Sequence, residues 1–322
     1  MMMTSPKYRA ALPQLKGGVF LADGGMETSL IFHDGIELPL FASFVLLRDD
    51  AGREALTRYF AEYLDIARER GVGFIVDTAT WRANPDWATK LDIGPAELDR
   101  LNREAVALAL SLRDEFERTS RQPGVVNGVI GPRGDGYRPD VQMAAREARL
   151  YHGVQIASLA AAGVDMVSAI TMNYINEAIG IALAAKDAGV PCVISFTVET
   201  DGNLASGATI GEAITAVEAA TGSSPAYYMI NCAHPRHFAQ WIPEGAEWIG
   251  RVRGVRANAS TKSHAELDES ETLDIGDPVD LAQRYRALRT SLPQMNVVGG
   301  CCGTDHRHIS AICDAILPAD LR

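Results

Sequence analysis

Residues 53–80, "REALTRYFAEYLDIARERGVGFIVDTAT", join two different patterns. Residues 53–71 carry apolar side chains at helical spacing and end on Gly71, a residue that suits the position just past a helix. Residues 73–80 form an apolar run without strict alternation, which is typical of a strand buried on both faces of a parallel sheet. The stretch therefore predicts a helix that leads directly into a buried strand.

Apolar runs of this kind recur along the chain, and helical patterns lie between most of them. The eight runs cover residues 19–25, 73–80, 125–132, 164–171, 190–200, 226–235, 248–260 and 296–303. The clearest helical patterns cover residues 53–71, 175–189, 209–222 and 277–289, and only a short helix fits into residues 235–246. The third pattern opens with Thr209 and Glu212 at capping-box spacing and closes at Gly222.

Eight strands that alternate with helices in 322 residues predict an α/β fold of the (β/α)8 TIM-barrel class, with residues 1–322 as one domain. An open doubly wound sheet is the alternative architecture. It lacks support, because no G-x-G-x-x-G motif follows the first run.

Composition narrows the classes of partner. The chain is 47% hydrophobic and 22% charged, as in globular proteins, and its net charge of −11 argues against nucleic acids and anionic membranes. No apolar run approaches the roughly 20 residues that cross a bilayer. Residues 1–18 lack an apolar core, so we expect no signal peptide. Five irregularly spaced cysteines do not suit a secreted disulfide framework, and we predict a cytoplasmic protein with reduced thiols.

Polar residues and cysteines gather where the predicted strands end, which is the active-site face of a (β/α)8 barrel. They are Asp23, Asp77, Thr78, Asn231, Cys232, Cys301 and Cys302. Cys232 lies on the sixth run and Cys301 and Cys302 on the eighth, so one strand separates them and their side chains should converge. Three thiolates with an open fourth position suit a catalytic zinc ion. The glycines beside them would let the backbone bend around one ion.

Other interpretations of the cysteines and histidines stay open. Cysteine is also a common buried apolar residue, which is our prediction for Cys192 and Cys313. A disulfide between neighbouring residues would be strained. His306 and His308 begin a predicted helix, which favours a solvated terminus over a zinc site. His234 is a candidate to support the metal ligands or a plain loop residue, and residues 131–140 form a loop that could cover the site.

Four motifs in order resemble the homocysteine S-methyltransferase family over nearly the whole chain. They are "LADGGMETSL" (21–30), "GVIGPRGDGY" (128–137), "INCAHP" (230–235) and "GGCCGTDHRHI" (299–309). The resemblance implies a zinc-dependent barrel enzyme in which Cys232, Cys301 and Cys302 hold the metal and act through it. It also implies that Asp23 lies near the amino group of the acceptor. The substrate-binding residues expected on this basis are Asp23, Gly24, Gly25, Thr78 and Asn231.

The implied reaction is methyl transfer to a zinc-bound thiolate, with homocysteine giving methionine as the first expectation. A free thiol has a pKa of about 8.5, and coordination to zinc removes its proton. The thiolate then attacks a methyl group on a sulfonium or quaternary ammonium donor. Trp81 or Tyr137 could attract such a cation through the ring face or could pack the loops. The expected partners are these small molecules, and the sequence allows a homo-oligomer.

Two residues depart from the pattern of the family. Ile170 stands where most members carry a glutamate that pairs with the acceptor amine, and Arg82 stands where some carry a tyrosine near the metal. A divergent enzyme that methylates or demethylates another thiol and donor pair therefore remains an alternative. So does a non-catalytic barrel that binds zinc or a ligand, although a structural zinc site would want four protein ligands.

Overall fold

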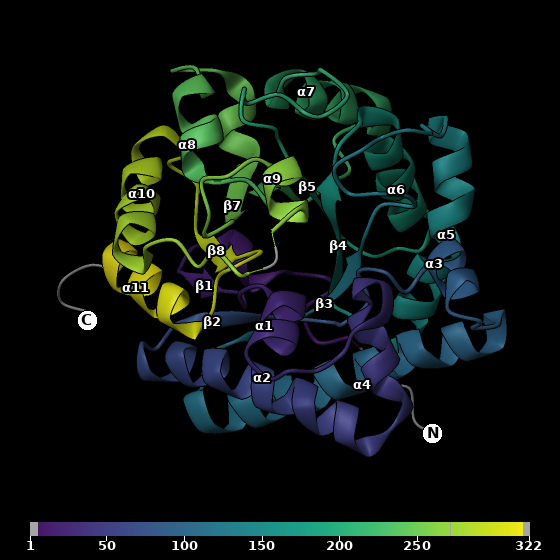
Figure 1. Cartoon of the computed structure of the whole chain (residues 1–322). Coiled ribbons are helices and arrows are strands. Elements are labelled where there is room, and N and C mark those ends of the chain that lie inside the picture. Colours follow the sequence, from purple (N-terminus) through teal and green to yellow (C-terminus); the bar gives the residue numbers. More distant parts are fainter. Residues whose placement is uncertain (1–5, 271, 318–322) are drawn as a thin grey trace.

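Eight parallel strands close into a barrel in the computed structural model, which describes residues 6–270 and 272–317 (Figure 1). The strands are β1 (Phe20–Leu21), β2 (Gly73–Asp77), β3 (Gly124–Ile130), β4 (Met166–Met172), β5 (Cys192–Phe196), β6 (Tyr227–Asn231), β7 (Val252–Ala257) and β8 (Val297–Gly300). Each pairs with the next along the chain, and β8 pairs with β1 through Val297 opposite Phe20. The predicted (β/α)8 barrel is confirmed, because an open sheet would leave two unpaired edges.

Helices surround the strands, as Figure 1 shows. The α-helices of the described residues are α1 (Met26–Phe32), α2 (Asp50–Glu69), α3 (Pro85–Lys90), α4 (Pro95–Ser120), α5 (Ala145–Ala162), α6 (Ile175–Asp187), α7 (Ile210–Thr221), α8 (Pro235–Phe238), α9 (His264–Asp268), α10 (Pro278–Ser291) and α11 (His306–Ile316). Short 3-10 helices cover Pro13–Lys16, Pro39–Phe41, Ser43–Arg48, Ala239–Trp241 and Glu247–Arg251.

The helix termini follow local sequence chemistry. The capping box of Thr209 and Glu212 forms at the start of α7, and Gly222 ends that helix with a φ of 65°. Gly71 likewise adopts a left-handed φ of 61° after α2. The stretch 235–246 holds only α8 and one 3-10 turn, as predicted.

Apolar side chains fill both faces of the strands. One cluster packs between strands and helices and includes Cys192 and Cys313, so their prediction as core residues is confirmed. A smaller cluster fills the barrel interior, with Ile75, Val129 and Met166 among its members. Fully burying an aliphatic side chain stabilises a fold by about 1.5–3 kcal/mol. The two clusters hold the strand ends in place on a rigid frame.

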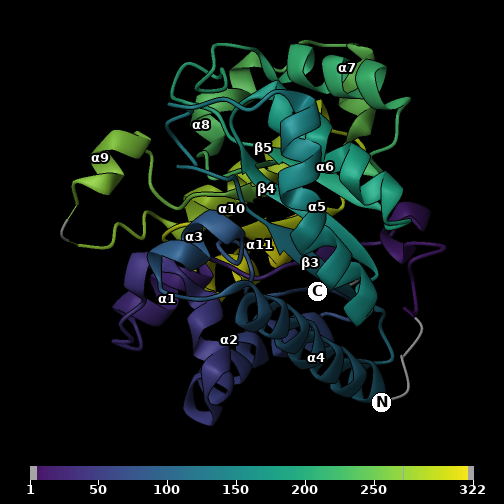
Figure 2. The same ribbon diagram turned by 90° about the vertical axis from the view of Figure 1, so that its right-hand side faces the viewer.

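The C-terminal ends of the strands form the functional side of the barrel. α1 follows the end of β1, α9 follows the end of β7, and Figure 2 shows both on the same side of the molecule. The prediction of one domain over 1–322 includes residues 1–5, 271 and 318–322, which lie outside the described part of the chain. Within the described part, none of the helices has the length and apolar character needed to cross a bilayer.

Candidate metal and substrate site

One pocket at the C-terminal ends of the strands contains every residue that the sequence nominated for metal or substrate binding. The nominated residues in its lining are Asp23, Gly24, Gly25, Thr78, Asn231, Cys232, Cys301 and Cys302. Ile170 lines the same pocket. Asp77, which the sequence placed at this face without a binding role, also lines it, as do two charged residues that the sequence did not single out, Glu27 and Arg256.

The three predicted ligand cysteines converge at this pocket. Their Sγ atoms all lie within 4.8 Å of one another, although Cys232 and Cys301 are 69 residues apart in sequence. Cys232 follows β6 with a left-handed φ of 52°, which is uncommon for a residue with a side chain. Cys301 lies directly against the start of α1, because a Cβ atom on Gly25 would come within 2.6 Å of its carbonyl oxygen. The close packing explains why a glycine precedes α1.

Cys232 and Cys301 are joined as a disulfide in this structure, and Cys302 is not part of that bond. The sequence predicted three reduced thiols, so this pairing differs from the expectation. Its physical reason is proximity, because sulfur atoms that converge on one point lie close enough either to share an ion or to bond to each other. Reduction of this pair is therefore a condition for metal binding by all three cysteines.

The donor set fits a metal ion once it is reduced. Tetrahedral zinc with Zn–S bonds of about 2.3 Å places its sulfur ligands roughly 3.8 Å apart. All three Sγ atoms lie within 4.8 Å of one another, so once the Cys232–Cys301 bond is reduced a small adjustment would bring them to this spacing. All three line one pocket, and the metal-ligand group found among the described residues contains no fourth protein ligand. This is the arrangement of a catalytic rather than a structural site.

Hydrogen bonds of the Asn231 side chain hold the segment that contacts Cys232. Its Oδ1 atom accepts hydrogen bonds from the Thr171 amide (3.0 Å) and the Ser195 hydroxyl (2.6 Å), and its Nδ2 atom donates to Thr171 Oγ1 (2.9 Å). Thr171 lies at an irregularity in β4 and has a left-handed φ of 67°. Its hydroxyl donates in turn to Cys232 Sγ at 3.8 Å. The amide of Asn231 is thus engaged by the protein itself and holds a cysteine in place.

His264, the first residue of α9, contacts the backbone of the same cysteine. One ring nitrogen lies 2.6 Å from the carbonyl oxygen of Cys232 and the other lies 3.0 Å from Glu199 Oε1. Tyr137 stacks on the imidazole with ring centroids 4.0 Å apart, and its hydroxyl lies 3.9 Å from Cys302 Sγ. The loop after β3 therefore covers the cysteines, as the sequence allowed.

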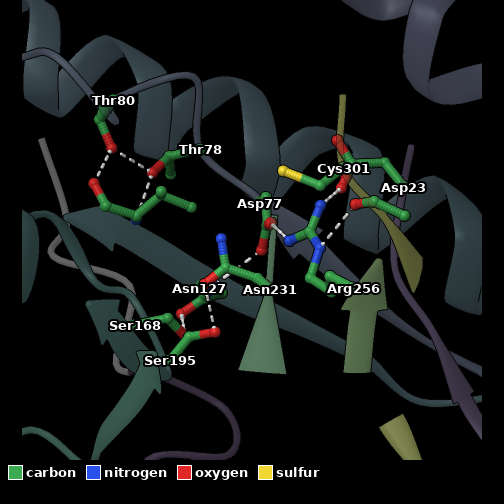
Figure 3. Close-up of polar contacts among 12 residues, drawn as sticks. Asp23, Asp77, Thr78, Thr80, Asn127, Ser168, Ser195, Asn231, Arg256 and Cys301 are labelled. Carbon is green, nitrogen blue, oxygen red and sulfur yellow. Dashed lines mark hydrogen bonds and ion pairs between the residues drawn. The ribbon is translucent and has the colours of Figure 1, made fainter. Parts of the chain in front are cut away.

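Arg256 lies between the carboxylates of Asp23 and Asp77 at the pocket floor (Figure 3). Nη2 donates to Asp23 and Nη1 to Asp77, and Nε donates to the Gly300 carbonyl oxygen at 3.2 Å. The hydroxyl of Tyr59 donates to the second oxygen of Asp23 at 2.9 Å. Three strands, β1, β2 and β7, thereby contribute to one buried ionic cluster.

Burial shifts the acid–base equilibria of this cluster. Burial raises the pKa of Asp23 to about 7, Arg256 acts in the opposite direction, and Asp77 raises it further. Burial lowers the pKa of Arg256, but the attraction of the two carboxylates outweighs it and the net shift is upward. Arg256 therefore stays cationic, so its positive charge is present in the pocket whether Asp23 is protonated or ionised.

Thr78 and Gly24 line the pocket, but local packing also accounts for them. Thr78 Oγ1 lies 2.6 Å from Thr80 Oγ1 and accepts from the Val129 amide at 3.0 Å. A Cβ atom on Gly24 would come within 2.7 Å of the Thr304 carbonyl oxygen. Both residues shape the pocket wall, and their role in substrate binding stays a prediction.

Other nominated residues lie outside the cysteine cluster. His234 caps α8, where Nδ1 accepts from the Arg236 amide at 3.2 Å. His306 is exposed, as expected for a helix terminus, but His308 is buried and contacts Asp305 Oδ1 at 2.9 Å. Arg82 stacks on the Trp87 ring at 4.0 Å and lines a neighbouring outer pocket. None of these side chains lines the pocket that contains the three cysteines, which we call the inner pocket.

Comparison with known proteins identifies the family to which the chain belongs. The family model described as homocysteine S-methyltransferase matches residues 20–316. The chain belongs to the homocysteine S-methyltransferase family. It is therefore a member of a family of methyltransferases.

Individual relatives of this family are distant but match over most of their length. Homocysteine S-methyltransferase 4 of Zea mays is 24% identical over 94% of this chain and 91% of its own. Homocysteine S-methyltransferase YbgG of Bacillus subtilis is 23% identical over 91% and 93%. The metallated form of the Escherichia coli homocysteine methyltransferase MmuM superposes with a TM-score of 0.75 at 20% identity, covering 95% of this chain and 99% of that one. This structural likeness supports the fold.

Proposed function

We propose that this protein transfers a methyl group from a sulfonium or quaternary ammonium donor to the sulfur of a small thiol, with zinc as its cofactor. The observation that carries the proposal is the convergence of three cysteine sulfurs within 4.8 Å at the mouth of a pocket. Membership of the family and the names of the relatives make homocysteine, which would give methionine, the first acceptor to test.

Cys232, Cys301 and Cys302 are the residues that would hold the metal. When bound, zinc would lower the pKa of the acceptor thiol and supply a thiolate at neutral pH. Asn231, Thr171 and His264 hold the ligand backbone and side chains through the hydrogen bonds described above. In the transfer itself, the acceptor sulfur forms a bond to the methyl carbon while the donor bond to that carbon breaks. The donor leaves as a neutral sulfide or tertiary amine.

An outer pocket beside the cysteines suits a cationic donor. It shares Phe41, Trp81, Tyr137 and Cys302 with the inner pocket, so a donor bound there would lie next to the acceptor sulfur. Aromatic ring faces attract cations within about 6 Å of the ring centre. The lining also contains the carboxylates of Asp135 and Asp274 and the guanidinium of Arg82, so it holds two acidic side chains and one arginine. Proximity of the two substrates is the main contribution of such a barrel.

The metal is tested first, on protein purified with a reductant and without chelator. We expect about one zinc ion per chain by elemental analysis. Cys302→Ala should lose the metal and the methylated product while the barrel stays folded, since Cys302 lies at the rim of the pocket. The matched control is Cys192→Ala, a buried cysteine of the core that should keep its zinc.

The reaction is tested by incubating the same preparations with homocysteine and a panel of sulfonium and quaternary ammonium donors. Mass spectrometry of the methylated thiol gives the readout. Full activity in a wild-type preparation without zinc would contradict the proposal, as would zinc retention by Cys302→Ala equal to that of Cys192→Ala.

A further inference from the structure

The carboxylates at the pocket floor already have protein partners at every oxygen. Asp23 accepts from Tyr59 on one oxygen and from Arg256 on the other. Asp77 accepts from Asn127 Nδ2 at 2.7 Å on one oxygen and from Arg256 on the other. A substrate ammonium at this place would have to displace these donors and would meet a guanidinium that cannot lose its proton.

One part of the pocket wall is apolar and offers an ammonium no compensation. Ile170 lines it with an apolar side chain, and Met26, Ala79 and Val129 are apolar too. An ammonium group that leaves water needs an anion or a full set of acceptors in exchange. The floor therefore has no unoccupied carboxylate oxygen for the group, and these apolar wall residues do not bind it.

We propose that Arg256 determines the class of acceptor, and that the pocket takes a small thiol without an ammonium group. This inference rests on the proposed function, because it names the acceptor of that same methyl transfer. Arg256 is a specificity-determining residue here: it pairs with both Asp23 and Asp77, so neither buried carboxylate is left to bind the amine of an amino-acid thiol.

Glu27 is the one carboxylate in the described pocket lining for which no ion pair to an arginine is found. It lies in α1, and its Oε1 atom accepts from the Ser43 hydroxyl at 2.8 Å. Burial raises its pKa above the ordinary value, while the hydrogen bond from Ser43 and the charges of Arg82 and Arg256 act in the opposite direction. Glu27 is thus the competing amine site that an experiment has to exclude.

Homocysteine and 4-mercaptobutyrate form a matched pair of probes, because they share the thiol, the chain length and the carboxylate and differ only in the amino group. Equilibrium dialysis on zinc-loaded protein measures their binding, and product formation with one sulfonium donor measures their use. We expect the wild-type protein to bind 4-mercaptobutyrate at least about tenfold more tightly than homocysteine. This ratio of affinities corresponds to the loss of one hydrogen bond to a charged group. The same order should appear in kcat/KM.

Variants test whether Arg256 is the cause. Arg256→Leu leaves two buried carboxylates without their cation, which threatens folding. Arg256→Leu combined with Asp77→Asn keeps Asp23 as a single free carboxylate and is the safer protein. In that double variant the preference should shift toward homocysteine by about tenfold or more. Glu27→Gln is the control, and it should leave the wild-type order of the two thiols unchanged.

The outcomes separate the inference from the proposed function. If both thiols are methylated and homocysteine is preferred, the inference is overturned while the proposed function stands. If Glu27→Gln then removes that preference, Glu27 is the residue that binds the amine. An unchanged order of the thiols in the double variant would also overturn it. If neither thiol binds or is methylated, the proposed function fails and the inference fails with it.

Discussion

Replacing Asn231 with alanine should weaken the metal site without touching a metal ligand. The side chain is fully buried and makes three hydrogen bonds, two to Thr171 and one to Ser195. Thr171 needs them, because a β-branched residue with a φ of 67° is strained. Without the amide, Thr171 is free to relax toward an ordinary strand conformation and its hydroxyl leaves Cys232 Sγ, now 3.8 Å away.

The magnitude follows from these contacts. Three net hydrogen bonds of about 1 kcal/mol each, plus the desolvated donors that stay unpaired, give a loss of about 3–5 kcal/mol in the free energy of unfolding. Loss of a group that orients metal ligands typically lowers metal affinity by about 10–100-fold. Urea denaturation measures the first quantity, and competition with a zinc chelator under reducing conditions measures the second.

Asn102→Ala is the matched control for this experiment. Asn102 is 1% exposed and also makes three hydrogen bonds, to Ala83, Leu98 and Gln155, but it lies on α4 away from the cysteines. Both variants should lose similar stability, and only Asn231→Ala should lose zinc affinity. Equal zinc affinities in the two variants would refute the reasoning.

Three further predictions concern the frame of the site. Gly25→Ala should cost about 1–3 kcal/mol and lower zinc affinity in the chelator assay, because the new Cβ would meet the Cys301 carbonyl oxygen at 2.6 Å. Burial alone would raise the pKa of Asp305, but hydrogen bonds from His308 and Arg307 outweigh burial, and the net shift is downward. The ionised Asp305 carboxylate therefore stabilises the fold above the ordinary aspartate pKa near 4, and this stabilisation is lost as the pH falls below that value. Asp305→Asn should therefore reduce the loss of stability below pH 4 in acid denaturation. Thr209→Ala removes the capping box of α7 and should cost about 1 kcal/mol by urea denaturation with zinc affinity unchanged.

The fold was predictable because each element carries its own signal. The run at residues 73–80 predicts a strand from apolar content alone, and Thr209 predicts the start of α7 from local capping chemistry. Closure of the barrel then needs only the count and order of these elements. The cysteine cluster was predictable for a related reason, since Cys232, Cys301 and Cys302 all follow predicted strands and have a chemistry that few other residues share.

The ionic floor of the pocket was not predicted, because its signal lies in pairing across the barrel. Arg256 sits in the apolar run of β7, and a buried arginine requires anions nearby. Asp23 and Asp77 were visible at the ends of other strands, yet nothing local indicates that one guanidinium bridges both. His264 was missed for the same reason, as its contact with the Cys232 carbonyl joins segments 32 residues apart.

Chemistry and recognition therefore depend on different strands of this barrel. The three cysteines follow β6 and β8, whereas the charged residues of the pocket floor lie in β2 and β7 and just after β1. Under the two proposals above, loss of one cysteine would abolish the metal site, whereas replacement of one arginine in β7 would change acceptor preference by about 10–100-fold, the effect of about 1.5–3 kcal/mol. Such a change leaves the fold and the cysteine motifs intact. Relatives at 24% identity can thus share the methyl transfer while their pockets select different thiols.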